Sequence, residues 1–208
     1  MNSFQCSKSL NLLDQPLIDE FEFPEKFNDG IPFKYAPISK ELIKRDLLDQ
    51  IESVGQEFGG AILFRKDPNA ISVLHSDILL DGGEWKLWHA AINWNLTNAK
   101  SRMEWYSTTS NVMQEEESIE WWQENFDIPY FLSGIHYEGS THKPKLDTEK
   151  FTLLESRNIR GSVLVRTDIP HRIVQMDKIV RWSLSIRLKT NHTWEEMLQI
   201  FSPFIKEE

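Results

Sequence analysis

The sequence predicts a mainly β domain with flanking helices. From Gly59 onward, short apolar runs alternate with turns that contain Gly, Pro or Asp, which is typical of antiparallel strands. The run at 180–188 alternates strictly between polar and apolar side chains, as a strand with two different faces requires. Many short strands with such turns favour a double-sheet jelly roll, which is a cupin-like double-stranded β-helix. At 208 residues, the whole chain 1–208 is expected to be a single domain with a sizeable core.

The first part of the chain, residues 1–58, is expected to form an N-terminal arm and a bracing helix. Four prolines interrupt residues 1–38, so this arm is predicted to be irregular and to wrap the surface. An amphipathic helix is predicted over 39–54, with Ser39 as its N-cap and Gly55 as its stop. Its apolar face would pack against the outside of a sheet.

The jelly-roll core is predicted over 59–190. Its strands are expected at 61–65, 71–78, 86–96, 102–108, 151–155, 162–166 and 179–188. An insertion from about 113 to 158 breaks this pattern, with a helix-like run at 118–126 and a loop-like stretch at 127–147. Long insertions of this kind are often functional, so we expect it to form the lid or wall of a pocket, the alternative being surface decoration. Residues 191–208 are expected to form a C-terminal helix that opens with a capping box at Thr193–Glu196.

Composition limits the partners of the chain. A net charge of −9 argues against general binding of nucleic acid, because phosphate binding needs clustered Lys and Arg, although a local basic pocket is compatible with it. There is no apolar run of membrane-spanning length and no signal-peptide core, and the single Cys6 allows no disulfide framework. We therefore expect a soluble, cytoplasmic protein without a membrane partner. The residues do not indicate its oligomeric state.

Three residues have the types and the spacing of a metal-ligand set. His75 and Asp77 are two positions apart, so on a strand they would project from the same face. His171 follows 94 positions after Asp77. Two imidazoles and one carboxylate suit Fe(II) and leave coordination positions open, whereas thiolates would favour zinc or an iron–sulfur cluster. The alternative is an exposed His–Asp pair on a strand and an unrelated histidine in a turn.

The run at 180–188 adds a predicted anion site. Arg181, Ser183, Ser185 and Arg187 share one face of this strand. Arginine matches a carboxylate in bidentate geometry, and a serine two positions on can donate to the same group. Arg181 could instead be a structural ion-pair residue. Arg187 lies roughly 20 Å further along the strand, too far to share the carboxylate, and is expected to meet substrate or nothing.

On these residues the chain resembles the Fe(II)/2-oxoglutarate-dependent dioxygenase superfamily, in particular its small phage-type and bacterial members. His75-Ser-Asp77, the distal His171 and Arg181-Trp-Ser183 match the motif of that family. The runs 88–96, 103–106 and 160–172 also look like its strands, and the resemblance covers roughly 59–190. It implies that His75, Asp77 and His171 bind iron and take part in catalysis. It also implies that Arg181 and Ser183 bind the far carboxylate of 2-oxoglutarate, and that Asn93 touches the same co-substrate.

The resemblance implies an enzyme, a hydroxylase that uses Fe(II), 2-oxoglutarate and dioxygen to oxidise an unactivated C–H bond. A small molecule such as an amino acid is the first expected substrate, because a compact domain can enclose a small ligand in the mouth of a β-barrel. A peptidyl or protein side chain is the second, and an alkylated nucleobase ranks lower because the chain is acidic. Two further alternatives are a non-catalytic jelly-roll binding protein and a zinc hydrolase, although the chain has no H-E-x-x-H helix.

Overall fold

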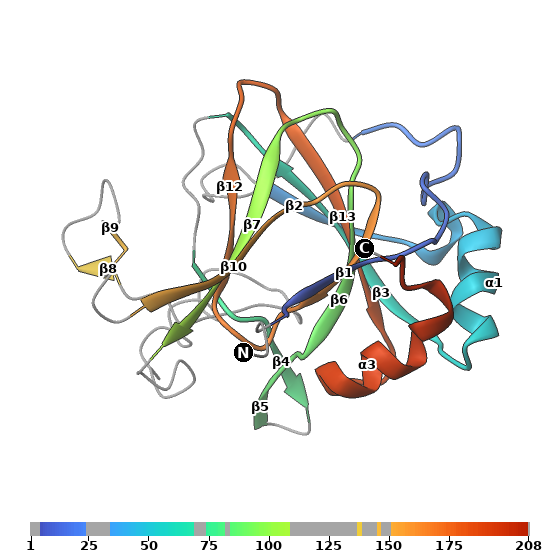
Figure 1. Cartoon of the computed structure of the whole chain (residues 1–208). Coiled ribbons are helices and arrows are strands. Elements are labelled where there is room, and N and C mark those ends of the chain that lie inside the picture. The colour runs from blue at the N-terminus through green and yellow to red at the C-terminus, as the bar shows by residue number, and fades with distance from the viewer. Residues whose placement is uncertain are drawn as a thin grey trace.

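Antiparallel strands are the main regular elements of the computed structural model, which describes residues 5–23, 34–68, 74–81, 84–108, 137–138, 145–146 and 151–207. Two helices, α1 (Arg45–Ser53) and α3 (Trp194–Ile200), lie on the same side of the molecule (Figure 1). The prediction of a mainly β chain with flanking helices is therefore confirmed. Within the described ranges, no helix has both the length and the apolar character needed to span a membrane.

The larger sheet has six strands in the order β1-β11-β6-β13-β3-β2, and every neighbouring pair is antiparallel. Its strands are β1 (Ser7–Ser9), β2 (Lys34–Ile38), β3 (Phe58–Lys66), β6 (Ala90–Asn95), β11 (Ser162–Arg166) and β13 (Arg181–Leu188). The central strand β13 pairs with β3 on one side and with β6 on the other. In this register Arg181 lies opposite Lys66, and Ser185 lies opposite Asn93.

The smaller sheet has three antiparallel strands, and a single bridge extends it by one more segment. Its order is β10-β7-β12, with β10 (Phe151–Asn158), β7 (Ser101–Thr108) and β12 (His171–Gln175). An isolated antiparallel bridge joins His75 to His171 on β12. The remaining elements are β4 (Ile78–Asp81) with β5 (Glu84–Leu87), β8 (Tyr137–Glu138) with β9 (Lys145–Leu146), and the 3-10 turns η1 (Lys40–Leu42) and η3 (Ser202–Phe204).

Most of the buried apolar side chains divide into a core beneath the helices and a core between the sheets. Leu184 and Ile186 of β13 belong to the first, which also holds Ile51 of α1 and Met197 of α3. Residues from both sheets form the second core: Ala91, Met103, Trp105, Val163 and Val165. Because β13 is buried on both faces, its polar face has to look into the space between the two sheets.

A glycine is required where β3 meets the end of β13. A Cβ at Gly59 would lie 2.4 Å from the carbonyl oxygen of Leu188, which is too close for any side-chain carbon. The strand register shifts at this point, between Arg187 and Leu188. The bulge therefore depends on Gly59 and lies beside the last polar residue of β13.

The N-terminal region differs from its prediction in two ways. Residues 7–9 and 34–38 are not irregular wrapping but form the two edge strands of the larger sheet. The predicted helix 39–54 begins later than expected, because η1 ends at Leu42 and Ile43 pairs with Leu17 before α1 starts. Ser39 makes no capping hydrogen bond, whereas Gly55, with a φ of 74°, follows the helix as predicted.

The strands of the core largely follow the predicted pattern, with some differences. The predicted strand 86–96 is split at Trp88–His89 into β5 and β6, and β12 was not among the predicted strands. The last eight residues of the predicted insertion, 151–158, form β10 and pair with β7. The helix-like run 118–126 and residues 71–73 lie outside the described residues. The capping box at Thr193 is confirmed.

Candidate metal centre

The structure brings His75, Asp77 and His171 together, although they come from different parts of the chain. His75 and His171 exchange two backbone hydrogen bonds of 3.0 and 2.7 Å, which place their rings 4.4 Å apart. The prediction that a strand over 71–78 carries His75 and Asp77 is wrong in its described part, because residues 74–77 precede β4 and form no regular strand, with His75 in an isolated bridge. The backbone of Asp77 is instead held by Thr167 and Trp88, through hydrogen bonds of 2.8 Å each.

The donor atoms of the triad are close enough to share one ion. Oδ1 of Asp77 lies 3.6 Å from Nε2 of His75 and 3.7 Å from Nε2 of His171. Both separations are of the size expected between two donors that bind one ion at about 2.1 Å. Across the whole triad, a set of donor atoms lies within 4.8 Å of one another. Two imidazoles and a carboxylate therefore form a group that could hold a divalent transition metal.

The tautomer and the protonation state of His171 both suit metal binding. Its Nδ1 lies 2.9 Å from the carbonyl oxygen of Ile169. A carbonyl only accepts hydrogen bonds, so Nδ1 carries the proton and Nε2 keeps its lone pair for a ligand bond. Burial lowers the pKa of His171 to about 4, against the opposing effects of the Ile169 bond and of Asp168. The imidazole is therefore neutral at physiological pH, the form that binds metals.

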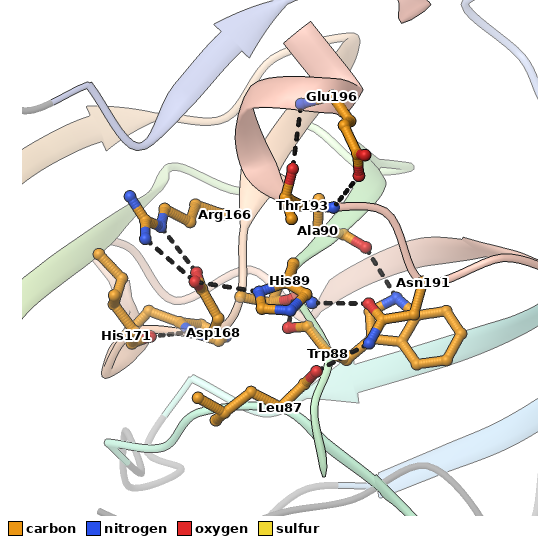
Figure 2. A network of polar contacts seen from close by, with 12 residues as sticks. Leu87, Trp88, His89, Ala90, Arg166, Asp168, His171, Asn191, Thr193 and Glu196 are labelled. Atoms are coloured by element: carbon orange, nitrogen blue, oxygen red, sulfur yellow. Dashed lines mark hydrogen bonds and ion pairs between the residues drawn. The ribbon is translucent and has the colours of Figure 1, made fainter. Parts of the chain in front are cut away.

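A polar network behind His171 fixes the turn that carries it (Figure 2). Arg166 donates to both carboxylate oxygens of Asp168, at 2.7 and 3.0 Å, and the same carboxylate lies 3.2 Å from Nδ1 of His89. The backbone of His89 in turn donates to Asn191, at 3.0 Å. Because the network spans the end of β11, the start of β6 and the segment before α3, it ties the turn at 167–170 to the rest of the fold.

Asp77 has a second partner that the sequence did not indicate. Its Oδ2 accepts a hydrogen bond from Nη2 of Arg187, and both side chains are buried. Arg187 was expected to meet substrate or nothing, and this expectation is wrong. Burial lowers the pKa of Arg187 to about 9, which still leaves it charged at neutral pH. One oxygen of Asp77 is therefore held by Arg187 while the other points to the two histidines.

The triad forms part of the wall of a cavity of about 110 Å³. The three co-substrate residues expected from the sequence, Arg181, Ser183 and Asn93, line the same cavity. Arg181 donates to the hydroxyls of Ser101 and Ser183, at 2.9 and 2.7 Å. Within the described part of the chain, no carboxylate pairs with Arg181, and burial lowers its pKa to about 10. A buried guanidinium bonded only to hydroxyls can still receive an anion.

Several polar atoms on this wall have no hydrogen-bond partner. Among the described lining residues they are Nε of Arg65, Oδ1 of Asn93, Oγ of Ser185 and Nη1 of Arg187. Buried polar atoms are normally satisfied, so a group of such atoms on one cavity wall is consistent with a polar ligand. The donor set fits a bound metal, and this wall fits a polar ligand beside it.

Sequence reasoning did not find three residues of the site. Lys66 ends β3 and reaches the cavity, Arg187 binds Asp77, and Thr167 holds the backbone of Asp77. The alternation along β13 already placed Arg187 on the polar face, but the contact across the sheets needs the fold. For Lys66, the only available signal was a lysine at the end of an apolar run.

Comparisons with known proteins add no family to this description, because no protein-family model and no curated protein matches the chain. The fold and the site define a mainly β, antiparallel, sandwich-like chain with a buried His-Asp-His triad that could bind a metal.

Proposed function

We propose that this chain is an Fe(II)- and 2-oxoglutarate-dependent oxygenase that hydroxylates a C–H bond of a small molecule such as an amino acid. The observation that carries the proposal is the buried Arg181, which pairs with no carboxylate of the described residues and lines the same cavity as the His-Asp-His triad. A metal site explains the triad alone, but the pairing of the two features calls for a ligand that binds a metal at one end and a guanidinium at the other.

The charge of the cavity supports a doubly anionic ligand. Its described lining holds four cationic side chains, Arg65, Lys66, Arg181 and Arg187, against the single carboxylate of Asp77. The chain as a whole carries a net charge of −9, so this cationic lining is a local feature of the cavity. Arg65 pairs with Asp67, and Arg187 pairs with Asp77. Burying charge is costly unless it is paired, and the distal carboxylate of 2-oxoglutarate would supply a partner for Arg181.

The order of strand pairing supports a double-stranded β-helix. Beginning at β3, the pairs are nested: β3 with β13, His75 with His171 on β12, β6 with β11, and β7 with β10. A ribbon that folds back on itself in this way and divides between two facing sheets gives the jelly-roll arrangement of two Greek keys. On this proposal, the insertion that precedes β10 lies at the fold-back, where we expect it to cover the substrate.

The residues have separate tasks in the proposed reaction. His75, Asp77 and His171 would hold Fe(II), and Arg181 with Ser183 would bind the distal carboxylate of 2-oxoglutarate. Asn93, whose Oδ1 is unpaired on the same wall, would contact the co-substrate. When bound, iron supplies the activation of dioxygen that couples decarboxylation of the oxo acid to oxidation of the substrate. The protein's own contribution is to orient both ligands and to exclude water from a buried cavity.

An anaerobic titration tests the proposal. The purified chain is stripped of metal, loaded with Fe(II) and titrated with 2-oxoglutarate, and the visible charge-transfer band of the chelate is recorded. We expect a band that saturates in the wild-type chain and is lost in His75→Ala, because that variant lacks one of the three ligands. His192→Ala is the matched control, since His192 contacts Gln56 and Glu196 away from the cavity.

Two results would count against the proposal. If Fe(II) binds but 2-oxoglutarate produces no band, the triad is a metal site with another task, such as that of a non-catalytic binding protein. If Zn(II) binds far more tightly and supports hydrolysis of a test ester, the hydrolase alternative replaces the oxygenase.

A further inference from the structure

We propose that Lys66 acts with Arg181 as a paired cation that binds the distal carboxylate of the co-substrate, so that the site selects a 2-oxo acid carrying a second carboxylate. This inference rests on the proposed function and adds a specificity-determining residue to it. The sequence motif that suggested Arg181 and Ser183 says nothing about Lys66, which comes from a different strand.

The first support is position. Lys66 is the last residue of β3 and Arg181 is the first residue of β13, and the two lie directly opposite each other in the antiparallel register. Both line the cavity, with exposed fractions of 9% for Lys66 and 4% for Arg181. Two cationic side chains therefore enter the same end of one buried space.

The second support is hydrogen bonding. Arg181 donates hydrogen bonds from two of its N–H groups to the hydroxyls of Ser101 and Ser183. Nζ of Lys66 donates to the carbonyl oxygen of Ile173 at 2.9 Å. A guanidinium has five donors, so Arg181 can keep both of its bonds and still donate to a carboxylate.

The third support is electrostatic. Burial, followed by the nearby charges of Arg181 and Arg172, lowers the pKa of Lys66 to about 8. Neighbouring cations repel each other strongly away from water, and a carboxylate bound between them removes this repulsion while it pairs with both. A ligand with a terminal carboxylate thus gains from Lys66 and Arg181 together, whereas a 2-oxo acid with a neutral tail gains from neither.

A structural role for Lys66 makes a different prediction. Its bond to Ile173 joins β3 of the larger sheet to β12 of the smaller one, so Lys66 could serve only to tether the sheets. Loss of a tether would lower the stability of the fold and weaken all 2-oxo acids alike. Loss of a carboxylate partner would weaken only the oxo acids with a distal carboxylate.

The test compares two ligands on Lys66→Met under anaerobic conditions with Fe(II). 2-Oxoglutarate has the distal carboxylate and 2-oxobutyrate lacks it, and the dissociation constant of each is measured by calorimetry. We expect Lys66→Met to weaken 2-oxoglutarate by about tenfold or more, as for loss of one charged hydrogen bond, and to change 2-oxobutyrate little. Lys66→Arg should retain most of the affinity, and Lys189→Met is the matched control because Lys189 is an exposed lysine paired with Glu57.

The possible outcomes separate the two proposals. If the wild-type chain binds 2-oxoglutarate and Lys66→Met binds it equally well, the role of Lys66 is overturned while the oxygenase proposal stands. If Lys66→Met weakens both oxo acids to the same degree, Lys66 is only a tether. If the wild-type chain binds neither oxo acid in the presence of Fe(II), both proposals fall.

Discussion

Asp77 is held from two sides in this fold, and the balance between them sets the properties of the candidate metal centre. Its Oδ1 faces the histidines, and its Oδ2 accepts from Arg187. The carboxylate and the guanidinium neutralise each other in a buried place, where either charge alone would be costly. A residue that hydrogen-bonds to a metal-ligating side chain usually orients that side chain and adjusts the affinity of the site for the metal.

Removing Arg187 should therefore destabilise the metal-free protein. We expect Arg187→Met to lower the free energy of unfolding by about 3 kcal/mol, because Asp77 is left buried without its cation. Added Mn(II) should restore much of the loss, since the ion supplies the missing positive charge. Urea denaturation with and without Mn(II) measures both effects.

Arg45→Met is the matched control for this variant, because Arg45 lies on the exposed side of α1 and pairs with Asp49 and Glu52 in solvent. A surface pair of this kind contributes little. Equal losses in the two variants, or no response of Arg187→Met to Mn(II), would mean that Arg187 does not balance Asp77.

At the scale of elements, a buried carboxylate joins two strands of the smaller sheet. Glu104 on β7 lies opposite Arg172 on β12 and accepts from it at 2.8 Å, from Tyr106 at 2.5 Å and from Arg102 at 2.7 Å. Burial acts to raise the pKa of Glu104, but these hydrogen bonds outweigh it and hold the pKa below the ordinary range. Since β12 carries His171 as its first residue, this cluster also supports the candidate metal centre.

The stabilising effect of Glu104 should depend on pH in a defined direction. Its pKa is lower in the folded than in the unfolded chain, so its contribution is complete above the ordinary carboxyl pKa and is lost as the pH falls through the folded value. At neutral pH we expect Glu104→Gln to cost about 2 kcal/mol. The difference from the wild-type chain should shrink on acidification, as denaturation curves across the acid range would reveal.

Glu20→Gln serves as the control, because Glu20 is an exposed carboxylate. A cost of Glu104→Gln that stays constant at all pH values would show that shape, and not charge, decides the role of Glu104.

At the scale of the whole molecule, the ligands of the triad meet only in the folded state. His75 and His171 lie on segments far apart in the chain, and one bridge between them brings the rings together. A metal that binds the folded chain alone must stabilise it by mass action, by about 2.7 kcal/mol at a hundred times its dissociation constant.

We therefore expect Mn(II) to raise the Tm of the wild-type chain and a chelator to return it to the metal-free value. His75→Ala should show no such rise, because the variant keeps the fold but lacks one ligand. Differential scanning calorimetry provides the measurement. A Tm that does not respond to any divalent transition metal in the wild-type chain would rule out the triad as a metal site.

Local patterns in the sequence were enough to predict several elements of this structure. The alternation at 180–188 predicted a strand with one polar and one apolar face, and the structure places Arg181 and Ser183 on one face and Leu184 on the other. The capping box at Thr193 predicted the start of α3. Such features depend on neighbours within a few residues, so they can be read before the chain is folded.

The tertiary structure decided what depends on contacts between distant segments. Asp77 is positioned by Thr167 and Trp88 and not by a regular strand, and the charge of Arg187 is directed at Asp77 from the far end of β13. Lys66 reaches the cavity only because β3 pairs with β13 in one particular register. Residue types and spacing alone determined which side chains could bind a metal and an anion. The fold decided which of them meet, because burial and pairing across the sheets set the distances between them.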